Sequence, residues 1–256
     1  MSRALRVLAR RVLGVRRVPT YYLPWLTRPG LECALVLHNV EARFKAGWNE
    51  GPFPLEVIQY GADGGVVRRR RLELRDNTDT IELPVEPVAD GCGFVSVACD
   101  RLLSNPCVTL TDGHEYTATH GRGEFVEHYP LHARLLLALL GRPLAAIGHT
   151  VPAFVRDQYV YLGAESRSHV LLLNLSTVTN RVRLVASGDG ASAAARLVAL
   201  PPLGARLVNV ASLGVPPAEG TRVWRLRLTG NAWFNLYLVG AGPKDLAGLL
   251  SLMHVK

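Results

Sequence analysis

The feature that most constrains the fold of this chain is a short apolar strand with a polar end, which occurs twice. The first copy spans Leu35–Asn39 and the second spans Leu171–Asn174. A Val-Pro pair precedes each copy, at residues 18–19 and 151–152. A turn rich in Gly and Asp follows each, at residues 61–65 and 188–190. An order of features that recurs along a chain indicates an internal repeat, here of one β unit.

The separations between corresponding residues favour this duplication. Asn39 and His120 lie 81 positions apart, and Asn174 and His254 lie 80 positions apart. The interior matches less well, and an inserted loop over residues 44–54 would account for the difference. Chance similarity between two β segments stays open as the alternative.

The strand patterns predict an all-β fold of two tandem antiparallel β-sandwich units, Ig-like or jelly-roll-like. Apolar residues alternate with arginines over residues 181–186 and 224–228, which is typical of half-buried strands. The expected organisation is a basic amphipathic helix over residues 1–17, a first unit over 18–129, a helical linker over 130–150 and a second unit over 151–256.

Two further helices are expected from their end signals. The linker should be helical over residues 130–141, because Pro130 suits a helix start and Gly141 suits a C-terminal cap. A second helix is expected over residues 243–253, with Pro243 opening it after a Gly-x-Gly turn.

The positive charge is concentrated near the N-terminus. The net charge is +8, and seven arginines precede Glu32, the first acidic residue, so that +8 − 7 leaves +1 for the rest. Such a basic amphipathic helix can lie on an anionic membrane surface, pack on the body or a partner, act in targeting or contact nucleic acid. The candidate docking residues are Arg3, Leu5, Arg6, Leu8, Arg10 and Val12.

Residues 112–128 hold the most suggestive group of titratable side chains. Imidazole and carboxylate ligands together suit zinc, iron or manganese. No known metal motif matches the spacing, so a solvated polar loop is the competing interpretation, and a divalent metal is the one cofactor considered. The candidate ligands are His114, His120, Glu124 and His128, with Glu115 or Glu127 as general base.

Four other residues are candidates for ligand or partner binding. Trp25 lies in a segment rich in Pro and aromatic residues, and Trp48 lies in the inserted loop. Arg68 and Arg70 belong to a run of four arginines, which places charge on both faces of a strand. Both faces cannot then be core, so the run indicates an edge strand.

Cysteine spacing and hydropathy indicate which compartment and which kinds of site to expect. Cys33, Cys92, Cys99 and Cys107 include no Cys-x-x-Cys pair, so neither a zinc knuckle nor a thioredoxin-type site is indicated. We expect free thiols in the cytoplasm, with a Cys99–Cys107 disulfide as the alternative. No run of 18 apolar residues occurs, so no transmembrane helix is expected.

These observations favour a non-catalytic binding or structural protein that engages a partner protein, a glycan or its own copies. Nucleotide-binding, nucleophile-elbow, kinase and zincin motifs are absent from the sequence, so an enzyme is not favoured. One alternative is a metal-dependent enzyme that uses residues 112–128. Another is a cytoplasmic protein peripheral to a membrane, or associated with nucleic acid, that is anchored by the N-terminal helix.

Overall fold

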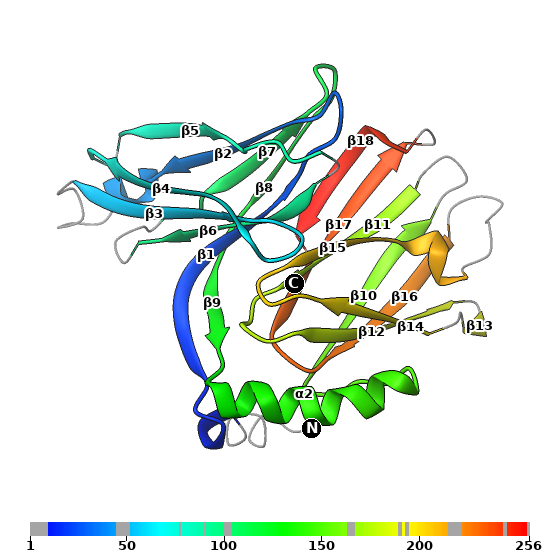
Figure 1. Cartoon of the computed structure of the whole chain (residues 1–256). Helices are drawn as coiled ribbons and strands as arrows, with labels where there is room; N and C mark the ends of the chain where they lie inside the picture. The colour runs from blue at the N-terminus through cyan, green and yellow to red at the C-terminus, as the bar shows by residue number, and fades with distance from the viewer. Residues whose placement is uncertain are drawn as a thin grey trace.

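A computed structural model describes residues 10–44, 52–76, 78–89, 91–99, 104–162, 167–188, 191–192, 195–214, 222–242 and 245–254. Within these ranges the protein is mostly β, with four antiparallel sheets, two in each half of the chain (Figure 1). Helix α2 (Leu131–Ala146) lies between the halves in sequence. The arrangement is consistent with two β-sandwich units joined by α2.

The first unit contains a five-stranded and a four-stranded sheet. The five-stranded sheet has the order β4-β3-β6-β1-β9, built from β1 (Arg16–Leu26), β3 (Phe53–Tyr60), β4 (Val66–Leu74), β6 (Cys92–Ala98) and β9 (Arg122–His128). The four-stranded sheet has the order β5-β2-β7-β8, built from β2 (Glu32–His38), β5 (Thr80–Pro84), β7 (Cys107–Thr111) and β8 (Tyr116–His120). A short 3-10 helix, η1 (Val40–Phe44), follows β2.

The second unit has the same general plan. One sheet has the order β10-β16-β12-β13, with β14 also paired to β12, and uses β10 (Phe154–Leu162), β12 (Asn180–Gly188), β13 (Ala191–Ser192), β14 (Arg196–Leu200) and β16 (Arg222–Gly230). The other has the order β15-β11-β17-β18 and uses β11 (Arg167–Asn174), β15 (Ala205–Asn209), β17 (Phe234–Gly242) and β18 (Asp245–His254). A 3-10 helix, η2 (Val210–Leu213), follows β15.

The two units pair their strands in the same way. Each strand pairing of the first unit, apart from that of β9, recurs in the second unit. The corresponding strands are, in order, β1, β2, β3, β5, β6, β7 and β8 in the first unit and β10, β11, β12, β15, β16, β17 and β18 in the second. Strand β4 corresponds to β13 and β14 together. Gly61–Gly65 follow β3, and Gly188 ends its counterpart β12; residues 189–190 lie outside the described ranges. His120 and His254 both end their strands. Strand β9, which pairs with β1, has no counterpart in the described part of the second unit.

The sheet that contains β11 is buried on both faces. Leu171 and Leu173 pack in a core cluster with the first unit, whereas Val170 and Leu172 pack in the core of the second unit. A continuous apolar run is typical of a strand that is covered on both sides. Its counterpart β2 alternates buried and half-buried residues, as expected for a strand with one covered face.

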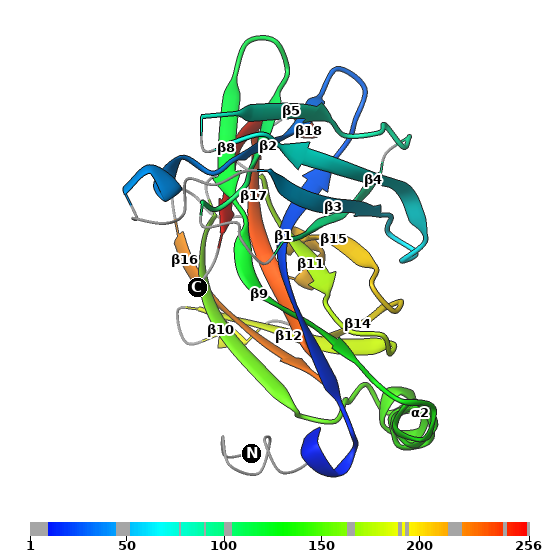
Figure 2. The same cartoon turned by 90° about the vertical axis from the view of Figure 1, so that its left-hand side faces the viewer.

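Strands β1 and β9 connect the first unit to α2. They run side by side as a long ribbon from the first unit to the helix (Figures 1 and 2). Higher on β1, the buried amide of Asn235 on β17 donates a hydrogen bond to the hydroxyl of Tyr22. Strand β15 also lies against β6. The two units therefore contact each other through sheets, in addition to their covalent link.

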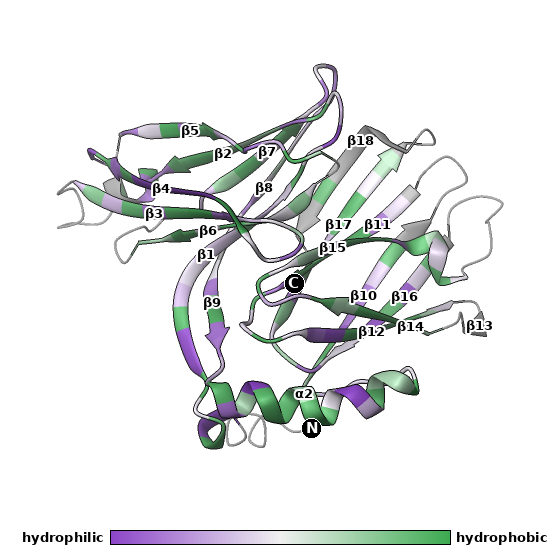
Figure 3. Cartoon of the chain, viewed as in Figure 1, coloured by the Kyte–Doolittle hydropathy of each residue, from purple (hydrophilic) through white to green (hydrophobic). Residues whose placement is uncertain are grey.

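Helix α2 is longer than the sequence predicted. It begins at Leu131, directly after Pro130, but it continues through Gly141 and Pro143 to Ala146. The left-handed residue after the helix is Gly148, with φ of 71°, whose N–H donates to the carbonyl of Ala145 at 3.0 Å. Much of the helix is hydrophobic along its length (Figure 3). The predicted end at Gly141 was therefore wrong.

The two ends of the chain also differ from prediction. A helix was expected over residues 243–253, but the described residues of this segment belong to the strand β18, which pairs with β17. Near the N-terminus, residues 10–12 are helical, but Gly14 has φ of 66° and β1 begins at Arg16. The predicted helix therefore ends before residue 17, and its residues 1–9 lie outside the described ranges. The expectation that Arg68 and Arg70 lie on an edge strand is confirmed, since β4 is at the end of its sheet.

The doubly covered position of β11 predicts that both units unfold together. Leu171→Ala and Leu172→Ala should each lower the free energy of unfolding by about 2–5 kcal/mol, because each leaves a cavity in a different core. Urea unfolding followed by tryptophan fluorescence should show one shifted transition in both variants. Val223→Ala, at an exposed position, is the control and should change stability by less than about 0.5 kcal/mol. Two separate transitions, each moved by one variant, would contradict this arrangement.

Candidate functional site

The four candidate metal ligands are spread over three segments. His114 lies in the turn between β7 and β8, His120 ends β8, and Glu124 and His128 lie on β9. In that turn, Asp112 Oδ1 accepts hydrogen bonds from the backbone N–H of His114 at 2.9 Å and of Glu115 at 2.7 Å. Within the described residues, no group of three or more His, Cys, Asp or Glu side chains is placed to hold a metal ion.

Two of the candidate ligand-binding residues, Trp25 and Arg68, already have partners within the protein. Trp25 is fully buried, and its indole N–H donates to the carbonyl of Tyr60 at 2.9 Å, so its ring is not open to a ligand. Arg68 forms an ion pair with Glu86. With Arg70 it lines a hollow of about 20 Å³, far below the roughly 300 Å³ at which small-molecule sites begin. Trp48 lies outside the described residues.

The N-terminal docking candidates are described in part. Arg10 is turned into the protein and forms an ion pair with Glu127, whereas Val12 is exposed. Arg3, Leu5, Arg6 and Leu8 lie outside the described residues. At least one arginine of the predicted basic face therefore has an internal role.

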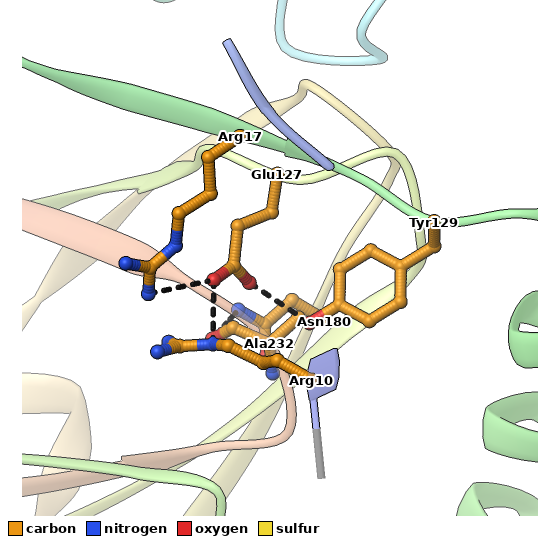
Figure 4. Close-up of polar contacts among 6 residues, drawn as sticks. All are labelled: Arg10, Arg17, Glu127, Tyr129, Asn180 and Ala232. Atoms are coloured by element: carbon orange, nitrogen blue, oxygen red, sulfur yellow. Dashed lines mark hydrogen bonds and ion pairs between the residues drawn. The ribbon is translucent and has the colours of Figure 1, made fainter. Parts of the chain in front are cut away.

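Glu127 is the centre of a buried polar cluster where the first unit meets the second (Figure 4). Its side chain is 0% exposed, and its Oε1 lies 2.8 Å from Nε of Arg10 and 3.5 Å from Nη2 of Arg17. Its Oε2 accepts a hydrogen bond of 2.8 Å from the hydroxyl of Tyr129. A buried carboxylate is tolerated when it is paired and hydrogen-bonded in this way.

The backbone of Glu127 adds a second link between the units. Its N–H donates to the carbonyl of Leu175, and its carbonyl accepts from the N–H of Thr177, both at 2.9 Å. These bonds join the end of β9 to the segment between β11 and β12. Glu127 thus holds three parts of the chain together: the N-terminal arm (residues 10–17), β9 and the second unit.

Aromatic rings surround this cluster. Phe125 on β9 stacks on Trp233 with ring centroids 5.0 Å apart, and Phe154 meets Trp233 edge-on at 5.3 Å. Arg17 lies 4.0 Å over the Phe125 ring and Arg10 lies 4.6 Å over the Phe154 ring. Cation–π contacts of this kind add to the ion pairs in holding the arginines in place.

The chemistry of the Glu127 cluster is that of a structural clamp. Burial, followed by the neighbouring carboxylate of Glu127, raises the pKa of Tyr129 above its ordinary value of 10.0. The phenol therefore stays protonated and keeps donating its hydrogen bond. With a fixed donor and two paired arginines, the carboxylate is engaged on both oxygens, which suits it to joining segments.

Helix α2 carries the most unusual surface of the described chain. Five leucines of the helix, together with Ile147 directly after it, have side chains that are between 43% and 71% exposed. We call this surface the leucine ridge; it consists of Leu131, Leu135, Leu136, Leu139, Leu140 and Ile147. An exposed apolar surface on a globular protein commonly marks an interaction site. The sequence of α2 contains no acidic residue and includes His132, Arg134 and Arg142.

A groove of about 320 Å³ runs beside the ridge, between α2 and the start of β12. We call it the arginine groove, because Arg134 and Arg142 of the helix and Arg181 of β12 line it. Leu131 and Leu135 belong to both the groove and the ridge. Among the residues that line the groove none is acidic, and within the described chain none of the three arginines forms an ion pair.

Sequence reasoning missed both the clamp and the groove. Arg10 and Glu127 are 117 positions apart, and nothing local in the sequence pairs them. A signal for the groove was present, since Arg134, Ala138 and Arg142 recur every four residues, a spacing that places side chains on one helix face.

Neither the cysteines nor the hydropathy of the described residues indicates a further site. The four cysteines are free thiols, and Cys99 and Cys107 belong to segments of different sheets. Burial raises the pKa of the Cys33 thiol to about 12, so it is a poor nucleophile at neutral pH. In the part of the chain that is described, no helix combines the length and hydropathy needed to cross a bilayer.

Comparison with protein-family models and with curated proteins finds no match to this chain.

The burial of Glu127 predicts that its charge matters for stability. Glu127→Gln should lower the free energy of unfolding by about 3 kcal/mol, because it breaks a buried ion pair and leaves half-buried Arg10 without its counter-ion. Glu86→Gln is the matched control: it breaks the exposed pair with Arg68 and should cost less than about 1 kcal/mol. Urea denaturation at neutral pH measures both, and equal losses in the two variants would refute a clamp at Glu127.

The raised pKa of Tyr129 predicts alkaline sensitivity. Above about pH 10 the unfolded chain loses tyrosine protons, whereas folded Tyr129 keeps its proton. The free energy of unfolding should therefore fall as pH rises past this value. In Tyr129→Phe this fall should be shallower by about 1.4 kcal/mol per pH unit. Urea unfolding at pH 10.5 and 11.5 checks the slope; identical slopes in the two proteins would contradict the assignment.

Proposed function

We propose that this chain is a non-catalytic binding protein that docks on an anionic membrane surface through the leucine ridge. Its two β units serve as a rigid support for α2. The observation that carries the proposal is the exposure of six apolar side chains on and directly after one helix that has no acidic residue.

The energetics of the ridge favour removal from water. A leucine side chain that is already half-buried gains about 1 kcal/mol when the rest of its apolar surface is covered. The six residues of the ridge together can then supply about 6 kcal/mol. Each Arg near an anionic membrane adds about 1 kcal/mol. These magnitudes suit reversible binding to a surface.

The charge around the ridge favours an anionic surface over a neutral or acidic partner. Arg134 and Arg142 flank it on α2. Exposed Arg11, Arg16 and Arg17 lie on the nearby N-terminal arm, and no acidic residue occurs before Glu32. The cytoplasmic leaflet is rich in anionic lipids and attracts basic segments next to apolar ones, which agrees with a cytoplasmic, membrane-peripheral location.

We include in this proposal that the scaffold arose by duplication of a jelly-roll-like unit. Without β9, which has no described counterpart in the second unit, the first unit has eight strands in two sheets of four, a number typical of that architecture. The recurrence of each strand pairing in the second unit supports a duplication. On this view the helix between the copies became the binding element, and the sheets keep it in place.

The proposal predicts loss of vesicle binding when the ridge is made polar. Leu136→Gln combined with Leu139→Gln removes two exposed side chains that do not line the arginine groove. Sedimentation with vesicles of phosphatidylcholine and phosphatidic acid should show at least about a tenfold weaker partition coefficient, since about 1.4 kcal/mol corresponds to tenfold.

Val66→Gln, at an exposed position on edge strand β4, is the control and should bind vesicles as the parent protein does. Unchanged vesicle binding in the double variant would refute the proposal. A concentration-dependent dimer that dissociates in the double variant, without vesicle binding by the parent protein, would show instead that the ridge joins two copies.

A further inference from the structure

The arginine groove has a composition that docking on a surface does not require. Its walls include apolar side chains from both sides, among them Leu135 and Val178, together with three arginines. Its volume of about 320 Å³ falls in the range of small-molecule sites. Mostly apolar walls with a few convergent polar groups are characteristic of a ligand pocket.

The position of Arg181 depends on a glycine in the helix. Gly141 is buried inside α2, where glycine is unfavourable relative to alanine. A Cβ atom at this position would come within 3.0 Å of Nη1 of Arg181. The glycine therefore lets the guanidinium of Arg181 lie close to the helix backbone, in the groove that Arg134 and Arg142 also line.

The three arginines bring positive charge together without compensation from the described protein. Arg134 and Arg142 are exposed, Arg181 is half-buried, and no acidic side chain lines the groove. Guanidinium groups present planar pairs of donors that match the oxygens of phosphate. Like charges held together in this way are stabilised when an anion is bound between them.

We propose that the arginine groove binds the phosphate group of an anionic phospholipid, whose acyl chains follow the leucine ridge. Leu131 and Leu135 support this arrangement, because each lines the groove and is also part of the ridge. A phosphate held by the arginines therefore has apolar surface beside it for the attached chains. The inference rests on the proposed function and assigns the lipid class that it recognises.

The test uses the full-length protein and two soluble probes, dihexanoyl phosphatidic acid below its micelle concentration and inorganic phosphate. Isothermal titration should show that the lipid binds at least tenfold more tightly than phosphate, since phosphate gains nothing from Leu131 and Leu135. Arg181→Gln and Arg134→Gln should each weaken lipid binding by about ten- to a hundredfold. Arg227→Gln, an equal loss of charge at an exposed strand position, should leave binding unchanged.

Gly141→Ala is a second variant that keeps all three arginines. Alanine is the better helix former, so the melting temperature should be equal or higher. The new Cβ, 3.0 Å from Nη1 of Arg181, should shift the guanidinium by a few tenths of an ångström, so lipid binding should weaken, but less than in Arg181→Gln. Unchanged lipid binding in both Arg181→Gln and Gly141→Ala overturns the inference, as does a failure of the parent protein to bind the lipid. Equal affinity for lipid and inorganic phosphate overturns it in favour of a free-phosphate site.

The two proposals fail in different ways. If the ridge alone binds membranes, Leu136→Gln with Leu139→Gln abolishes vesicle binding while Arg181→Gln leaves it unchanged on phosphatidic acid vesicles. If the groove binds lipid but the ridge does not dock, the soluble lipid binds in an Arg181-dependent manner and the parent protein does not sediment with vesicles.

Discussion

One sheet of this protein is buried from both sides, and this burial joins the two units into one folded body. The sheet of β11 and β17 has Leu171 and Tyr237 in one core and Leu172 and Leu236 in the other. Neither unit can supply both coverings, and exposing one face would cost about 25 cal/mol for each Å² of apolar surface. The two units therefore share a core, although their strand order is that of separate sandwiches.

The two units have the same strand pairing but differ in what joins or fills the space between their two sheets. In the first unit, the segment after β5 closes the gap between sheets: the side chain of Gln59 bonds both backbone groups of Glu86, at 2.9 and 3.0 Å. In the second unit, strand β12 instead places the apolar side chain of Leu184 in the core. There the chain turns into η2 after β15, and Leu213 fills the core.

Prediction from the sequence succeeded where the information was local. Alternation of apolar residues located most strands, and the arginine run at 68–71 correctly indicated an edge. The helix expected at residues 243–253 was wrong because leucine-rich segments of that length fit either period, and pairing with β17 decides in favour of a strand. Gly141 lies inside α2 and not at its end. It packs against Arg181, a contact between segments that no end signal encodes.

The candidate sites were harder to predict than the strands. The histidines and carboxylates of residues 112–128 are close in sequence, but β8 and β9 carry them into different sheets. Conversely, Glu127 meets Arg10 only because β1 and β9 form a ribbon. The leucines of α2 were visible in the sequence, yet periodicity could not tell that their face would remain uncovered, since this depends on where both units place the helix.

The clamp at Glu127 can form only after both halves of the chain have been synthesised. Synthesis delivers the N-terminal half first. The partners of Glu127 at Leu175 and Thr177, and the Asn235 amide that bonds Tyr22, leave the ribosome later. Until then, the nascent first half exposes apolar surface and backbone groups that the second half covers in the folded protein. Folding of the first half is therefore complete only after the second half has been synthesised. Ribosome pausing between the halves would prolong an intermediate that is prone to aggregation.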